Sequence, residues 1–176
     1  VEKGINIIQE LPEEASEILL GDPHRIKQIL INIIGNSIKF TESGYIKIQM
    51  TVEKFTGDQR WVRIRIKDTG IGMDPGFMDN LFKKFVQEDS SIVRKFGGTG
   101  LGLSITKELI ELMGGTIAVQ SAKGAGTEMT LTFPFRTGSE LDLPKSADQS
   151  ELSAGEVEGY RVLLVEDNEL NQQVAT

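Results

Sequence analysis

Three polar side chains lie on one face of a helix that the sequence predicts from Pro23 onward. Asn32, Asn36 and Lys39 recur at i, i+4 and i+7, so they project from one side of that helix, beside its apolar stripe. An amide oxygen is a neutral, hard ligand suited to Mg²⁺, and a nearby ammonium can contact a phosphate that the metal also touches. Asparagine is a poor helix former, so two in one helix favour a functional role. A solvated helix edge is the alternative.

A carboxylate is predicted where a strand ends. Asp68 follows the alternating segment "WVRIRIK" and precedes "TGIGM", which places it beside glycines that present no side chain. A carboxylate accepts hydrogen bonds but cannot donate them. It would therefore favour an exocyclic amine, as on adenine, over a carbonyl, as on guanine, by about 1.5–3 kcal/mol. Taken alone, these residues are explained more simply as an ordinary strand-to-turn segment.

A glycine-rich segment, "RKFGGTGLGLSI", leads into a second predicted helix. It lacks the G-x-G-x-x-G dinucleotide fingerprint, and no G-K-[ST] occurs for a P-loop. Unpaired backbone N–H groups at a helix N-terminus favour an anion, and Arg94 and Lys95 add positive charge at the entrance. A flexible loop is the alternative here, and the later glycine turn "KGAGTE" by itself indicates only a hairpin.

Hydrophobic periodicity predicts the elements that position these residues. The first twenty residues suit strand and turn, and Asp22 is the expected N-cap of the helix from Pro23. "YIKIQM" and "WVRIRIKD" are expected as antiparallel strands joined by the loop "EKFTGDQR", and "TIAVQ" and "TEMTLTFPF" as two further strands. The expected apolar stripes are Ile26, Ile29, Leu30, Ile33, Ile34 and Ile38 in the first helix, and Leu101, Ile105, Leu109, Leu112 and Met113 in the second.

Composition bounds the class of protein. The 176 residues allow one well-cored domain plus a remnant, and no apolar stretch is long enough to cross a bilayer. A net charge of −7 argues against sequence-independent nucleic-acid binding, which needs a surplus of Lys and Arg. With no cysteine and one histidine, disulfides, thiolate metal sites and multi-histidine zinc sites are excluded.

Five segments in this order resemble the catalytic ATP-binding domain of sensor histidine kinases, within the superfamily of gyrase, Hsp90 and MutL ATPases. They are the N box "NIIGNSIKFT", the G1 box "DTGIGM", the F box "LFKKFVQ", the G2 box "GGTGLGL" and the G3 box "GAGT". Each is weak alone, but five in order are specific. The resemblance implies a two-layer α/β sandwich, with a mixed, mostly antiparallel sheet covered on one face by helices, that binds ATP and Mg²⁺ beneath a lid from about Asp79 to Gly100.

The resemblance also implies roles for individual residues. Asn36 would be the Mg²⁺ ligand, Asn32, Lys39 and Arg94 would act at the phosphates, and Asp68 would bind the adenine amine. Gly70 and Gly72 would let the ring approach, while Phe82 and Phe85 would support the lid. Further nucleotide contacts are expected at Phe40, Ile71, Met73, Gly98, Thr99, Gly100, Leu101, Gly102, Leu103 and Thr127.

Position 32 separates the branches of this superfamily. Hydrolytic relatives carry a glutamate there as the base that activates water, and Asn32 cannot accept a proton at neutral pH. The resemblance therefore favours a kinase over an ATPase, with a degenerate nucleotide-binding module as the remaining alternative. No segment before Asp22 resembles the phosphoacceptor motif, and His24 is expected to be a surface residue rather than a catalytic one.

The domain organisation is expected to have three parts. Residues 1–136 would form the catalytic domain, 137–159 a flexible acidic linker, and 160–176 the first strand and helix start of a receiver domain, whose "RVLLVEDN" includes the paired acids Glu166 and Asp167. The expected partners are ATP or ADP, a histidine-containing dimerisation domain of the same protein, and a receiver domain or response regulator. A monomeric fragment of a homodimeric, cytoplasmic kinase is expected.

Overall fold

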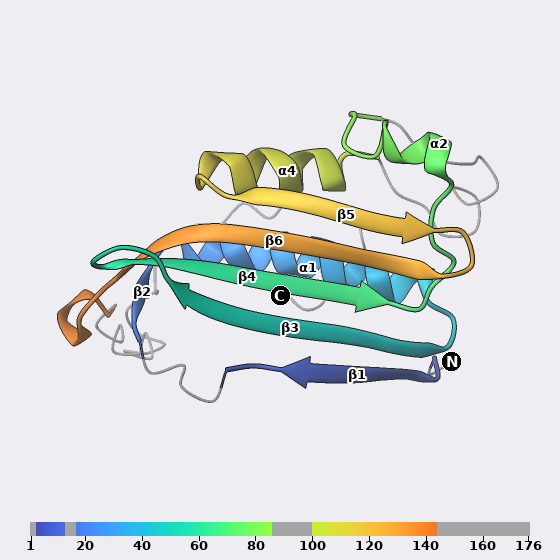
Figure 1. Ribbon diagram of the computed structural model, residues 1–176. Coiled ribbons are helices and arrows are strands. Elements are labelled where there is room, and N and C mark those ends of the chain that lie inside the picture. Colours follow the sequence, from blue (N-terminus) through green and yellow to red (C-terminus); the bar gives the residue numbers. More distant parts are fainter. Residues whose placement is uncertain (1–2, 13–16, 86–99, 144–176) are drawn as a thin grey trace, which may run out of the picture. The chain divides into compact units, whose positions relative to one another are not determined.

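The computed structural model describes residues 3–12, 17–85 and 100–143, which form a mixed sheet with helices packed on it (Figure 1). The strands are β1 (Ile5–Glu10), β2 (Leu19–Leu20), β3 (Gly44–Lys54), β4 (Gln59–Asp68), β5 (Thr116–Ala122) and β6 (Gly126–Thr137). Their order is β1-β3-β4-β6-β2, and β5 also pairs with β6. The β1–β3 pair is parallel and the other described pairs are antiparallel. The expected mixed α/β architecture is therefore confirmed.

Helix α1 (Pro23–Phe40) lies behind the sheet, and its N-terminus forms as the sequence predicts. The Asp22 carboxylate accepts hydrogen bonds from the backbone N–H groups of His24 at 3.0 Å and Arg25 at 3.1 Å. The predicted apolar stripe is wrong at its end, because Ser37 is buried whereas Ile38 is 39% exposed. Ser37 lies one turn beyond the buried Ile33 and continues the core-facing side of the helix.

Helix α4 (Gly102–Leu112) shows a similar departure from the predicted stripe. Ile105 and Leu112 are exposed, whereas Ile110 and the hydroxyl-bearing residues Ser104 and Thr106 are buried. Both hydroxyls have partners, since Ser104 donates to the Leu101 carbonyl and Thr106 accepts from Asn32. Hydrogen bonding therefore lets polar residues occupy core positions that periodicity assigns to apolar ones.

The strands follow the predicted alternation closely. Val62, Ile64 and Ile66 of β4 are buried in one core with residues from α1, α4 and β6. Because β3 and β4 extend to Lys54 and Gln59, the connecting loop is shorter than predicted. Thr137, expected in the linker, belongs to β6, and the short helices α2 (Pro75–Met78) and η1 (Glu140–Asp142) complete the described elements.

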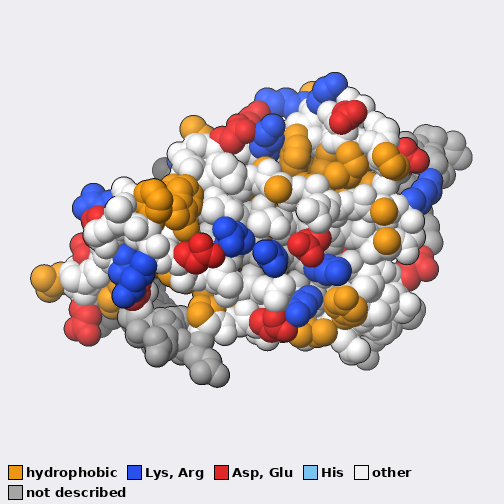
Figure 2. Space-filling view, in the orientation of Figure 1, with side chains coloured by type: hydrophobic (Ala, Val, Ile, Leu, Met, Phe, Trp, Pro, Cys, Tyr) orange, Lys and Arg blue, Asp and Glu red, His pale blue; other side chains and the backbone are white. Residues whose placement is uncertain are grey.

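The opposite face of the sheet is polar. Figure 2 shows basic and acidic side chains interspersed over it, in the orientation of Figure 1. Ion pairs on the strands include Lys47 with Glu10 at 2.7 Å and Arg63 with Glu53 at 3.0 Å. This distribution is typical of a solvated sheet face. In the described residues, no helix is long and apolar enough to cross a membrane.

The segment before β1 contacts the end of α1. The Lys3 ammonium donates hydrogen bonds to the carbonyls of Ile38 at 2.7 Å, Lys39 at 3.1 Å and Thr41 at 3.2 Å. The last carbonyls of a helix have no partner within the helix, so a lysine there satisfies them and offsets the negative end of the helix dipole. The N-terminal segment is thereby attached to the helix that carries Asn32, Asn36 and Lys39.

Candidate functional site

The Asp68 carboxylate joins three parts of the fold. Its side chain is buried, and Oδ1 accepts hydrogen bonds from the backbone N–H groups of Gly70 at 3.0 Å and Thr127 at 3.1 Å. Oδ2 accepts a hydrogen bond from the Ser37 hydroxyl at 3.0 Å. The carboxylate thus links the end of β4 to the start of β6 and to α1. Its orientation is fixed by three donors.

The residues after Asp68 are held on two sides. Ile71 donates its N–H to the Phe40 carbonyl at 3.2 Å and accepts at its own carbonyl from the Gly124 N–H at 2.7 Å. The Met73 N–H donates to the Ser121 hydroxyl at 2.9 Å. Residues 69–73 are therefore hydrogen-bonded on one side to the end of α1 and on the other to β5 and the β5–β6 turn.

Two glycines in this segment are required by backbone packing. A Cβ on Gly70 would lie 2.5 Å from the Phe40 carbonyl oxygen. Gly72 has a φ of +61°, and a Cβ there would lie 1.9 Å from the Ala122 carbonyl oxygen. Both glycines therefore have a structural reason in addition to any contact with a ligand.

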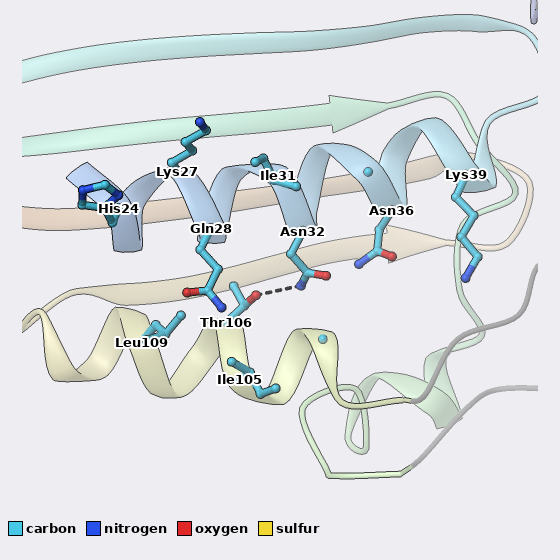
Figure 3. Close-up of a pocket in the computed structure, with 12 residues that line it drawn as sticks. His24, Lys27, Gln28, Ile31, Asn32, Asn36, Lys39, Ile105, Thr106 and Leu109 are labelled. Carbon is cyan, nitrogen blue, oxygen red and sulfur yellow. Dashed lines mark hydrogen bonds between the residues drawn. The ribbon is translucent and has the colours of Figure 1, made fainter. Parts of the chain in front are cut away.

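A groove of about 570 Å³ runs between α1 and α4 (Figure 3). Asn32, Asn36 and Lys39 line it, so the structure brings the predicted polar triplet together on one wall. The volume is within the usual range of small-molecule sites. Asp68 does not line the described groove, but its partner Ser37 is the neighbour of Asn36 on α1.

The groove's two walls are joined through Asn32. Its Nδ2 donates a hydrogen bond to the Thr106 hydroxyl of α4 at 2.7 Å (Figure 3). A Cβ on Gly102 would lie 2.6 Å from the Asn32 Oδ1, so a glycine at the start of α4 lets the helices approach this closely. Sequence reasoning missed Thr106, Ser37 and Ser121, whose roles depend on partners distant in the chain.

Two sources of positive charge lie along the groove: the Lys39 ammonium and the N-terminal end of α4. The Lys39 ammonium lies 5.0 Å from the centre of the Phe40 ring. In the described residues, α4 begins at Leu101 and Gly102 without a side-chain cap. The first N–H groups of such a helix, including that of Leu103, favour an anion.

The described ends of the predicted lid lie close together. The Phe85 N–H donates to the Gly100 carbonyl at 3.2 Å, and both residues have positive φ, +62° for Phe85 and +69° for Gly100. The Phe85 side chain is exposed, while the Phe82 ring lies 5.3 Å from the Lys107 ammonium of α4. The predicted phosphate contacts Arg94, Gly98 and Thr99 lie outside the described residues, as do Glu166 and Asp167.

His24 is exposed in the first turn of α1, as predicted, and lines the far end of the groove (Figure 3). It lies two turns before Asn32, or about 12 Å along the axis at 1.5 Å per residue. In the described part of the chain, no group of three or more His, Cys, Asp or Glu side chains could hold a metal ion.

Comparison with known proteins places the chain among relatives that are sensor kinases. It is 36% identical over 172 residues to the autoinducer 2 sensor kinase/phosphatase LuxQ of Vibrio parahaemolyticus, covering 96% of this chain and 20% of that protein. It is 41% identical over 172 residues to the sensor histidine kinase GacS of Pseudomonas protegens, covering 97% of this chain and 18% of that protein. The hybrid signal transduction histidine kinase K of Dictyostelium discoideum is 36% identical over 182 residues, covering 99% of this chain and 15% of that protein. The chain thus spans about a fifth or less of these relatives.

Solved structures show the same fold. Full-length ShkA, crystallised in complex with AMPPNP, matches with a TM-score of 0.63 and 35% identity over 78% of this chain and 27% of that one. The mycobacterial sensor histidine kinase MprB matches with a TM-score of 0.57 at 21% identity, covering 77% of this chain and 85% of that one. Residues 21–137 match the family described as histidine kinase-, DNA gyrase B-, and HSP90-like ATPases. The chain therefore belongs to the family of histidine kinase-, DNA gyrase B-, and HSP90-like ATPases.

Proposed function

We propose that this chain binds Mg·ATP and donates the γ-phosphate to a histidine on a dimerisation domain outside the chain. The observation that supports the proposal is the hydrogen bond from Ser37 to Asp68, because it attaches the predicted adenine acceptor to the same helix that carries Asn36 and lines the groove. ShkA, a relative in this fold, was crystallised with an ATP analogue. The catalytic domain would run through the end of β6 at Thr137, followed by a linker and a receiver domain that begins near residue 160.

The base would bind at the Asp68 end. The carboxylate can only accept hydrogen bonds when ionised, so it favours the exocyclic amine of adenine over the carbonyl of guanine. The segment with Gly70, Ile71, Gly72 and Met73 would line the base site, together with Phe40 and Thr127. Because this segment is already hydrogen-bonded on both sides, the base would enter a site that needs little further ordering.

The phosphates would bind where α1 approaches the start of α4. Lys39 would contact them directly, and the N–H groups from Gly102 and Leu103 would add donors at a positive helix end. The Asn36 amide oxygen suits Mg²⁺, which would take its remaining ligands from phosphates and water. When bound, Mg²⁺ would neutralise charge that develops on the phosphate oxygens.

Asn32 would help to position the γ-phosphate and would not deprotonate an attacking water. Its amide has no basic group, and its Nδ2 is already committed to Thr106. Water at the γ-phosphate would therefore find no general base at this position, so ATP would survive until an imidazole nitrogen attacks. In that step a P–N bond forms at the γ-phosphorus as the bond to the β–γ bridging oxygen breaks, and ADP leaves.

Titration calorimetry tests nucleotide binding directly. ATP and ADP should bind, GTP should bind at least tenfold more weakly, and Mg²⁺ should strengthen ATP binding. Asp68→Asn replaces an acceptor oxygen with an amide donor and should weaken ATP at least tenfold, which corresponds to about 1.4 kcal/mol. Asp58→Asn is the matched control, since Asp58 lies on the exposed β3–β4 loop and pairs with Arg136 of β6. Unchanged ATP affinity in Asp68→Asn would remove Asp68 from the site.

Phosphotransfer requires a second measurement. Supplied with the dimerisation domain of the same protein, the chain should produce acid-labile phosphate on histidine, and alone it should hydrolyse almost no ATP. ATP binding without transfer would instead support the degenerate nucleotide-binding module. Steady hydrolysis by the isolated chain would contradict the role given to Asn32.

A further inference from the structure

The hydrogen bond between Ser37 and Asp68 is buried at both ends. Ser37 is 6% exposed and Asp68 is 5% exposed, and Oγ lies 3.0 Å from Oδ2. An ionised carboxylate has no hydrogen to donate, so the hydroxyl must be the donor. Its hydrogen therefore points to Asp68, which leaves only lone pairs on Oγ for any third group.

The acceptor capacity of Asp68 is almost used within the protein. A carboxylate offers about four lone-pair positions, two on each oxygen. Oδ1 already accepts from the N–H groups of Gly70 and Thr127, and Oδ2 accepts from Ser37. Counting donors from the described residues only, about one acceptor position remains, and it is on Oδ2, the oxygen that accepts from Ser37.

We propose that Ser37 is a positioning residue that sets the preference of this site for an amine-bearing purine. By donating to Oδ2 it fixes that oxygen with one acceptor position open, and it offers no hydrogen of its own to a ligand. An exocyclic amine finds an acceptor there, whereas a ring carbonyl finds only lone pairs. The inference rests on the proposed function, because it requires the base to bind at Asp68.

Removal of the hydroxyl separates two classes of ligand. In Ser37→Ala the bonds to Oδ1 remain, but Oδ2 loses its only described side-chain donor and is no longer held in one orientation. A ligand amine that donates to Oδ2 should therefore bind more weakly. The effect should be measurable, because a hydrogen bond to a charged carboxylate contributes more than one between neutral groups. A purine with a carbonyl in place of the amine gains nothing from Ser37 in either protein, so its affinity should barely change.

The experiment compares ATP with inosine triphosphate, which carries a carbonyl at the position of the adenine amine. In Ser37→Ala, calorimetry should show ATP binding five- to tenfold more weakly and inosine triphosphate changing by less than twofold. Ser37→Thr keeps a hydroxyl and should recover most of the ATP preference. Ile33→Val, one turn earlier on the same buried side of α1, should lower stability without changing the ratio of the two affinities.

A double variant tests whether Ser37 acts through Asp68. In the Asp68→Asn background, adding Ser37→Ala should cost ATP affinity less than twofold, and additive losses would overturn the inference. Equal weakening of both nucleotides by Ser37→Ala would also overturn it, because a purely structural role predicts that result. If Ser37→Ala does not fold, Ser37→Cys, with a weaker donor of similar size, makes the same comparison. If the wild type fails to bind ATP, the proposed function falls first; if it binds ATP with an unaltered preference in the variants, only the Ser37 inference falls.

Discussion

Replacement of Gly72 by alanine should disrupt the segment that we propose lines the base site. Gly72 has a φ of +61°, a conformation that costs a residue with a Cβ about 1–2 kcal/mol. The new Cβ would also lie 1.9 Å from the Ala122 carbonyl oxygen, so residues 69–73 must move away from the β5–β6 turn. That movement breaks the Gly124–Ile71 bond of 2.7 Å and the Met73–Ser121 bond of 2.9 Å, each contributing about 0.5–1.5 kcal/mol.

The expected loss in the free energy of unfolding is about 2–5 kcal/mol from these contributions together. Urea denaturation followed by circular dichroism measures it. The control is Gly57→Ala, because Gly57 has a similar φ of +54° but no atom within 4 Å of its added Cβ, so only the conformational cost of about 1–2 kcal/mol remains. Calorimetry at a temperature where both variants are folded should show weaker ATP binding only in Gly72→Ala. Equal losses of stability in the two variants would refute the role of the Ala122 contact.

Three further predictions concern stability. Thr41 is fully buried and its hydroxyl has no partner among the described residues, so Thr41→Val should leave the free energy of unfolding unchanged or raise it by about 1 kcal/mol; a loss above that in urea denaturation would reveal a hidden partner. Gly35→Ala, in the exposed part of α1 with space for a Cβ, should raise the unfolding free energy by about 0.5–1 kcal/mol, and a decrease would contradict the helical geometry. The hydrogen bonds from Arg60 lower the pKa of Glu17 below its ordinary 4.5, so their stabilisation is complete above that pH and is lost as the pH falls through the lowered pKa. In Glu17→Gln, the free energy of unfolding should therefore fall less steeply as the pH drops below about 4.5 than in the wild type. The same pH dependence in both proteins would show that the Glu17–Arg60 pair does not contribute to stability.

The sheet could be predicted from the sequence more fully than the faces of the helices. A strand with one buried face alternates strictly, and the pattern of Val62, Ile64 and Ile66 fixes which side chains of β4 face the core. Helix faces are less well determined when polar residues enter the core. Ser37 and Thr106 are buried because Asp68 and Asn32 supply hydrogen bonds, and those partners are distant in the chain.

The candidate site, too, could be predicted only where local spacing determines it. Helical spacing alone put Asn32, Asn36 and Lys39 on one face, and the structure places all three along the groove. The position of these three residues relative to Asp68 could not be derived from spacing, because it depends on how α1 packs against the end of β4. Ser121 was also unpredictable, since its hydroxyl is one of many in the strands until Met73 is brought beside it.

The Lys3 ammonium at the end of α1 has an electrostatic consequence for anion binding. The C-terminal end of a helix carries about half a negative charge, and this end lies beside Lys39, where a triphosphate would be repelled by it. Lys3 covers the exposed carbonyls of Ile38 and Lys39, although it lies 36 residues from Lys39 in the chain. Lys3, just before β1, thus supplies a positive charge that would offset this repulsion without contacting a bound triphosphate. Affinity for a polyanion would then depend on a lysine in the segment that leads into the edge strand of the sheet.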